Sequence, residues 1–245
     1  MRISFFSKVT ASIILCITIL FSCKDDSYLK ATPPSANQSF VEEFDTASSA
    51  LSRGWKFINV SVPMGGGVWQ NGGDINPLFS AFSNNGSFAG FIGTDFTSTS
   101  AAQGVISNWL LSPEIIMKNG DKIIFYTRSL SYFDPTLVDT TDYGNSLQVM
   151  INTSNDLNNV GKGTDPGSFT NSLLNINPTM AFSSTVTPDP DAYPTKWTRF
   201  EATITTLPNP VKGKFGFRYY VTDGGSNGNG SGIGIDSVAF KSAGY

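Results

Sequence analysis

From residue 40 onward, short stretches in which apolar and polar residues alternate are separated by turn-forming residues about every dozen positions. A period of two predicts β-strands with one buried face, and it is clearest over residues 121–129 and 146–152. The chain contains 24 Gly and 13 Pro, which is typical of strands joined by turns. We therefore predict an all-β chain that folds as a jelly-roll β-sandwich of two antiparallel sheets.

The individual elements can be placed along the sequence. The expected strands cover residues 39–44, 55–60, 88–93, 105–111, 121–129, 146–152, 195–205, 214–221 and 232–241. Residues 156–160 and 168–175 are expected to form a short helix or turn. Asn119-Gly120 is a typical hairpin turn, and residues 223–232 resemble a flexible hairpin loop because they lack the ligand pattern of a calcium-binding loop.

The N-terminus has the pattern of a lipoprotein signal peptide. Basic Arg2 and Lys8 precede an apolar run that ends in Leu-Phe-Ser-Cys at Cys23. We expect a signal peptide over residues 1–22, a lipid on the Cys23 thiol that anchors the protein to a membrane, and a flexible tether over residues 23–38. The folded domain would span residues 39–242. Residues 23–26, CKDD, resemble an export signal for lipoproteins, so we expect a bacterial outer-membrane lipoprotein exposed at the cell surface.

Charge and composition exclude several functions. The formal net charge is −3, and it becomes −5 once Arg2 and Lys8 are removed, so we expect no nucleic-acid partner. The chain has no histidine, and neither Cys16 nor a lipidated Cys23 would leave a free thiol in the mature protein. Triad catalysis, thiol catalysis and His-ligated zinc are thereby excluded. Glu42, Glu43, Glu114 and Glu201 occur in no recognisable catalytic setting, so we expect no enzyme.

Four sequence blocks occur in an order that resembles one known family. They are FVEEFD at residues 40–45 followed by Gly54-Trp55, NWLLSPEI at 108–115, Trp197 with KFGFRY at 214–219, and GIGIDSV at 232–238. Together they resemble the choice-of-anchor J domain, which is related to cleaved adhesin domains and is similar to MAM modules. The resemblance implies a jelly-roll β-sandwich that acts as a surface-displayed, lipid-anchored, adhesin-like binding module for glycan or protein ligands, without catalysis.

The resemblance also implies a structural Ca²⁺ where the first and last strands meet. The candidate ligands are Glu42, Glu43, Asp45 and Asp236. Calcium needs six to eight oxygen ligands, which carboxylates and carbonyls can provide. Strand alternation places Glu43 and Asp45 on one face, whereas the family alignment favours Glu42, and both choices stay open. The alternative is that these acids are solvated or accept hydrogen bonds from the backbone.

A ligand site is expected at Trp69-Gln70-Asn71. Sugars stack on exposed aromatic rings, and neighbouring amides bind their hydroxyl groups. The alternative is that the rings fill the core of the sandwich, as we expect for Trp55, Trp109 and Trp197.

Two other functions stay open at this stage. The chain could be a structural or accessory envelope lipoprotein with a protein partner only, in which case a flat apolar patch is expected. A carboxylate-dependent glycan hydrolase would need two acids facing each other across a cleft. An exposed Trp69 in a concave face would favour the binding module.

Overall fold

The computed structural model describes residues 36–74, 79–84, 87–134 and 139–244. The predicted signal peptide, Cys23 and most of the predicted tether lie outside the described residues. Residues 37–245 form one compact unit, and the first strand begins at Phe40. None of the helices in the described ranges has the length and apolar character needed to cross a membrane.

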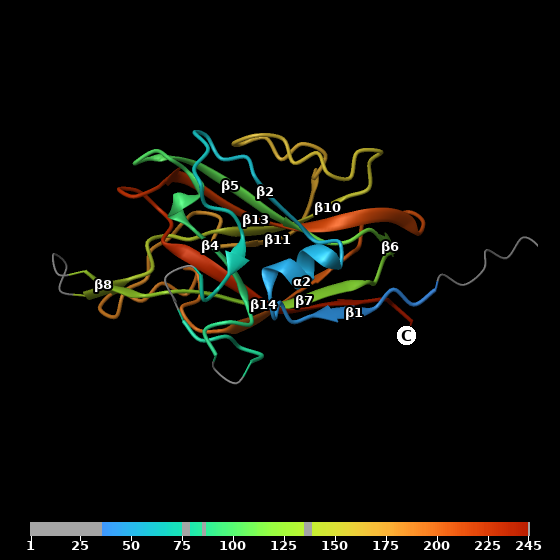
Figure 1. The fold of residues 1–245 in the computed structure, drawn as a ribbon, viewed down its shortest axis with the longest axis horizontal. Coiled ribbons are helices and arrows are strands. Elements are labelled where there is room, and N and C mark those ends of the chain that lie inside the picture. Colours follow the sequence, from blue (N-terminus) through green and yellow to red (C-terminus); the bar gives the residue numbers. More distant parts are fainter. Residues whose placement is uncertain (1–35, 75–78, 85–86, 135–138, 245) are drawn as a thin grey trace, which may run out of the picture. The chain divides into compact units, whose positions relative to one another are not determined.

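The first of the two large sheets is antiparallel and contains six strands (Figure 1). Its order is β12 (Thr198–Thr203), β7 (Lys122–Ser129), β14 (Gly232–Lys241), β4 (Ile92–Asp95) and β3 (Gln70–Asn71), and β1 (Phe40–Glu42) also pairs with β14. The first and last strands of the domain are thus neighbours, with Phe40 opposite Phe240.

The second large sheet is also antiparallel and has six strands. Its order is β11 (Asn171–Ile176), β10 (Leu147–Asn152), β13 (Val211–Gly224), β5 (Gly104–Leu111) and β2 (Lys56–Asn59), and β6 (Ile115–Met117) also pairs with β13. Three small elements complete the described part: the β8 (Tyr132–Asp134) and β9 (Asp139–Thr141) hairpin, helix α2 (Ala47–Ser52) and the 3-10 helix η3 (Phe96–Ser98). The predicted jelly-roll β-sandwich of two antiparallel sheets is confirmed.

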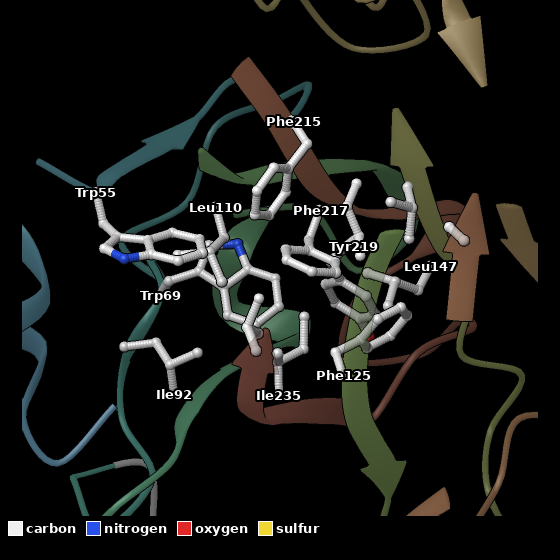
Figure 2. Close-up of a cluster of buried hydrophobic side chains, with 14 of the residues drawn as sticks. Trp55, Trp69, Ile92, Leu110, Phe125, Leu147, Phe215, Phe217, Tyr219 and Ile235 are labelled. Carbon is white, nitrogen blue, oxygen red and sulfur yellow. The ribbon is translucent and has the colours of Figure 1, made fainter. Parts of the chain in front are cut away.

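The main core lies between the two large sheets (Figure 2). Phe215, Phe217 and Tyr219 are alternate residues of β13, so all three point inward and all are completely buried. Phe125 of the opposite sheet meets Phe217 edge to face, with ring centroids 4.9 Å apart. Burying each such ring stabilises the fold by about 1.5–3 kcal/mol.

The outer face of each large sheet is also partly covered by apolar side chains. Trp109 and Leu111 alternate with the core residue Leu110, and they pack against Val160 and Phe169 on the outer side of β5. On the other sheet, a separate cluster of Phe79, Ala81 and Phe91 packs against Trp197. Strands covered on both faces read as continuous apolar runs.

Two predicted elements differ from the structure. The strand expected at 88–93 begins only at Ile92. Residues 168–175, expected to form a helix or turn, contain most of the edge strand β11. Pairing with β10 supplies the hydrogen bonds that local propensity does not predict for this segment.

Both expected hairpin turns instead connect the two large sheets. The Asn119-Gly120 turn joins β6, which pairs with β13, to β7 of the other sheet. The loop from Asp223 to Gly232 joins β13 to β14, which also belong to different sheets. A turn motif specifies the local backbone but not the partner of the strand that follows it.

Candidate functional site

Trp69 was expected to present an exposed ring, and the structure contradicts this. Its side chain is 1% exposed and lies in the main core between the sheets (Figure 2). Trp69 comes directly before β3, and the core absorbs its large apolar surface. A sugar cannot stack on this ring.

The two residues that follow Trp69 are half-buried on β3. The Asn71 side-chain oxygen accepts a hydrogen bond from Ala47 N at 2.5 Å, and its amide donates to the Asp74 carboxylate at 2.8 Å. The Asn71 side chain therefore binds the first residue of α2 (Ala47–Ser52) and Asp74, and it is not free for a ligand. Gln70 remains half-buried beside a ring that is inaccessible.

Glu42, the first predicted calcium ligand, is an ion-pair partner. It is 3% exposed, and both carboxylate oxygens accept from Arg53, at 2.7 Å from Nε and 2.5 Å from Nη2. Oε1 also accepts from Phe44 N at 3.0 Å. The strand ends at Glu42, and Phe44 has a left-handed φ of 52°, so the predicted alternation does not continue to Asp45.

Asp236, the predicted ligand on the last strand, anchors a distant segment. Its carboxylate accepts from Phe82 N at 2.8 Å, from Ser83 N at 3.0 Å and from the Ser83 hydroxyl at 2.9 Å. Burial raises its pKa to about 6, and the hydrogen bonds from Ser83 and Phe82 oppose that shift. The carboxylate ties residues 82–83 to β14.

The four predicted calcium ligands do not gather into one carboxylate cluster. In the described ranges, no three Asp, Glu or Cys side chains come together in a way that could hold a metal ion. Glu42 and Asp236 have both oxygens occupied by protein donors, Asp45 is exposed, and Glu43 is half-buried with an Oε2 that has no hydrogen-bond partner in the described part of the chain. Glu42 and Asp236 therefore fit the alternative, in which the acids accept hydrogen bonds from the protein.

A groove of about 970 Å³ opens where β8 lies, at the end of the domain away from β1 and the C-terminus (Figure 1). Its size is in the range of small-molecule binding sites. Five aromatic residues line it: Phe96, Tyr132, Phe133, Tyr143 and Phe182. Three of them are unusually accessible for apolar rings, with exposed fractions of 62% for Phe133, 52% for Phe182 and 38% for Phe96.

The loop between β13 and β14 also lines the groove. It contributes Asp223 and residues 225–231, GSNGNGS, to the lining. Asn229 N donates to Asp223 O at 2.8 Å, and Asn227 N donates to Ala102 O at 3.0 Å, so backbone hydrogen bonds hold the loop. The side chains of Asp223 and Asn227 have no hydrogen-bond or ion-pair partner in the described part of the chain.

Asn145 connects the segments that build the groove. Its side-chain oxygen accepts from Ser231 N at 3.1 Å and Gly232 N at 3.0 Å, and its amide donates to Asp142 O at 2.7 Å. Its backbone oxygen accepts from the Asn177 side chain at 2.8 Å. Asn145 is completely buried, so it fixes the three segments before any ligand arrives.

Asn177 fixes the backbone of the segment that carries Phe182. Its amide donates to Ala181 O at 2.9 Å, and its side-chain oxygen accepts from Ala181 N at 2.8 Å. This pair closes a tight loop immediately before Phe182. The exposed ring is thereby held on a defined backbone.

The electrostatic surroundings of the groove are acidic. Burial, together with the charge of Asp95, raises the pKa of Tyr132. Asp142, the residue before Tyr143 in the sequence, is completely buried, and this burial raises its pKa. One Asp142 oxygen accepts from Ser183 N at 3.3 Å, while the other has no hydrogen-bond partner.

The sequence patterns do not predict this groove. They predict only a flexible hairpin loop over residues 223–232. The available signal was two aromatic residues, Phe133 and Phe182, inside polar, turn-rich segments that need no core side chains. Phe133 and Phe182 lie about fifty residues apart in the sequence, and periodicity does not reveal that their segments converge.

The structure defines a jelly-roll β-sandwich domain with a loop-built aromatic groove. Neither a protein-family model nor a curated protein matches the chain. Among solved structures, the K3 cleaved adhesin domain of Lys-gingipain from Porphyromonas gingivalis is similar, with a TM-score of 0.50 and 16% identity, over 85% of this chain and 99% of that one. The K1 cleaved adhesin domain of the same protein gives a TM-score of 0.49 and 20% identity, over 84% and 99%. At 16% identity, the likeness to the K3 domain shows the fold alone.

Proposed function

We propose that the chain is a non-catalytic binding module that recognises glycans in the aromatic groove. The observation that carries the proposal is the convergence of three exposed rings with a hydrogen-bonding loop in one concavity. Exposed Phe133 and Phe182 offer apolar faces on which a sugar ring can stack. The loop between β13 and β14 offers the unpaired polar side chains of Asp223 and Asn227 to sugar hydroxyls.

The distribution of carboxylates supports binding rather than hydrolysis. A glycosidase needs two carboxyl groups about 5–10 Å apart in its cleft. Asp223 is the one carboxylate among the described residues that line the groove. Glu114 is paired with Lys212 at 2.9 Å and Glu201 with Lys122 at 2.6 Å, so both of these candidates are engaged elsewhere.

Surface display and the membrane anchor belong to the same proposal. The predicted lipid on Cys23 and the tether over residues 23–38 would join the domain at β1. Tyr132 and Phe133 of β8 line the groove, and β8 lies at the end of the domain away from β1 (Figure 1). An anchor at β1 would therefore leave the groove accessible on an outer-membrane lipoprotein. Membership of the choice-of-anchor J family is proposed on the four sequence blocks.

The test uses the mature chain from residue 23 with Cys23→Ser, applied to an array of plant, bacterial and host polysaccharides. We expect Phe133→Ala and Phe182→Ala each to weaken glycan binding about tenfold, since each removes one stacking surface worth about 1.4 kcal/mol. Phe88→Ala is the matched control, because Phe88 is 53% exposed and does not line the groove.

Two results would contradict the proposal. Unchanged binding by both groove variants would place the site elsewhere. If the wild-type chain bound no polysaccharide, the glycan ligand would be wrong, and the protein-partner alternative would take its place.

A further inference from the structure

We infer that the groove selects uncharged sugars and rejects glycans that carry carboxylate or sulfate groups. This inference rests on the proposed function and adds the class of ligand to it. It derives from the placement of charges around the groove.

The lining of the groove contains no Lys or Arg among the described residues. Recognition of carboxylate, sulfate or phosphate in proteins ordinarily uses Arg or Lys side chains or a cluster of backbone N–H groups. Here Gly225 N and Asn227 N of the loop already donate to the backbone oxygens of Asn229 and Ala102. An anionic substituent would therefore leave water without gaining a charged partner.

Asp223 places a negative charge at the wall of the groove. It is exposed, and its carboxylate has no ion-pair or hydrogen-bond partner in the described part of the chain. Its left-handed φ of 52° belongs to a turn that Asn229 closes on the Asp223 backbone oxygen. A carboxylate held in this way accepts hydrogen bonds from sugar hydroxyls and repels an anion.

A second acid, Asp95, comes directly before the lining residue Phe96, and its charge contributes to the raised pKa of Tyr132. Like charges about 4 Å apart in water repel enough to weaken binding by roughly fivefold, and more where water is excluded.

The experiment compares matched pairs of soluble polysaccharides, each as the neutral polymer and as its carboxymethylated derivative. The pairs are β-1,3-glucan, xyloglucan, galactomannan and xylan, and the protein is the unacylated chain from residue 23. We expect every neutral polymer that binds to lose at least about fivefold in affinity on carboxymethylation at low ionic strength. The loss should shrink in about 0.5 M salt, because exposed charges are then screened within a few ångströms.

Two variants assign the selectivity to the groove. Asp223→Asn removes the charge and keeps a residue that tolerates the left-handed backbone. It should reduce the difference in affinity between neutral and charged polymers. Asn227→Lys adds a cation to the lining, so it should reduce this difference in affinity further or make the charged polymer bind more tightly. Asp191→Asn is the control, since Asp191 is exposed and lies outside the groove.

The outcomes separate the inference from the proposed function. Equal or tighter binding of the charged polymers by the wild-type chain would overturn the inference and leave the glycan-binding function standing. The inference would also be overturned, with the glycan-binding function still standing, if Asp223→Asn and Asn227→Lys both kept the wild-type difference in affinity between neutral and charged polymers. Absence of binding to either member of every pair would overturn the proposed function, and the inference with it.

Discussion

The hydroxyl of Tyr219 donates a 2.8 Å hydrogen bond to the side-chain oxygen of Asn145, and both residues are completely buried. Tyr219 belongs to the row of core residues on β13, whereas Asn145 holds the segments around the groove. This contact therefore joins the sandwich core to the binding site. The rigidity of the groove depends on the packing of the core.

We predict that Asn145→Ala is strongly destabilising. It removes the acceptor of Tyr219 Oη, Ser231 N and Gly232 N at once. A buried polar group that loses its partner costs about 1–3 kcal/mol, so we expect the free energy of unfolding to fall by about 3–5 kcal/mol. Chemical unfolding measures this. The control, Asn175→Ala on exposed β11, should change stability by about 0.5 kcal/mol or less, and a similar loss in both variants would refute the role of Asn145.

Asp236 should make stability depend on pH. Its pKa of about 6 is above the ordinary value of 3.8, so its contribution to stability is fully present below pH 3.8 and is lost as the pH rises through 6. The difference between these two pKa values corresponds to about 3 kcal/mol of unfolding free energy. Unfolding free energies of wild type and Asp236→Asn, measured from pH 4 to 7.5, should diverge by roughly this amount. Parallel profiles would show that Asp236 does not titrate in this way.

The ion pair between Glu42 and Arg53 should contribute more than a surface pair. Glu42 is 3% exposed, so Arg53→Met would leave a buried carboxylate without its cation. We expect a loss of about 2 kcal/mol, below the value for a fully buried pair because Arg53 is half exposed. Arg199→Met breaks the exposed pair with Glu201 and should lower the stability much less than Arg53→Met does. Equal costs measured by thermal unfolding would contradict this ranking.

Calcium should have little effect on the stability of this domain. Glu42 and Asp236 are occupied by protein donors, so the predicted calcium ligands do not form a complete set in the described residues. We expect Tm to agree within about 1 °C in calcium and in chelator. A fall of several degrees on chelation, restored by calcium, would show that the domain has a calcium site after all.

The burial of Trp69 and the partners of Glu42 and Asp236 were not predictable because they depend on residues in other segments of the chain. Asp236 and Phe82 are 154 positions apart, yet the Phe82 amide donates to that carboxylate. An isolated carboxylate in a strand gives no sign of which donor will reach it. A residue type suggests what a side chain can bind, while its neighbours decide whether it is free to do so.

The sequence alone determined the architecture. The alternation of apolar and polar residues and the placement of glycine and proline are local patterns in the sequence. They predict strands, turns and two antiparallel sheets. Only the tertiary structure decided which aromatic rings face solvent. Trp69 is buried, whereas Phe133 and Phe182 are exposed beside the loop from Asp223 to Ser231. Burial depends on which distant segments pack together, and that is settled only when both sheets have formed around their shared core.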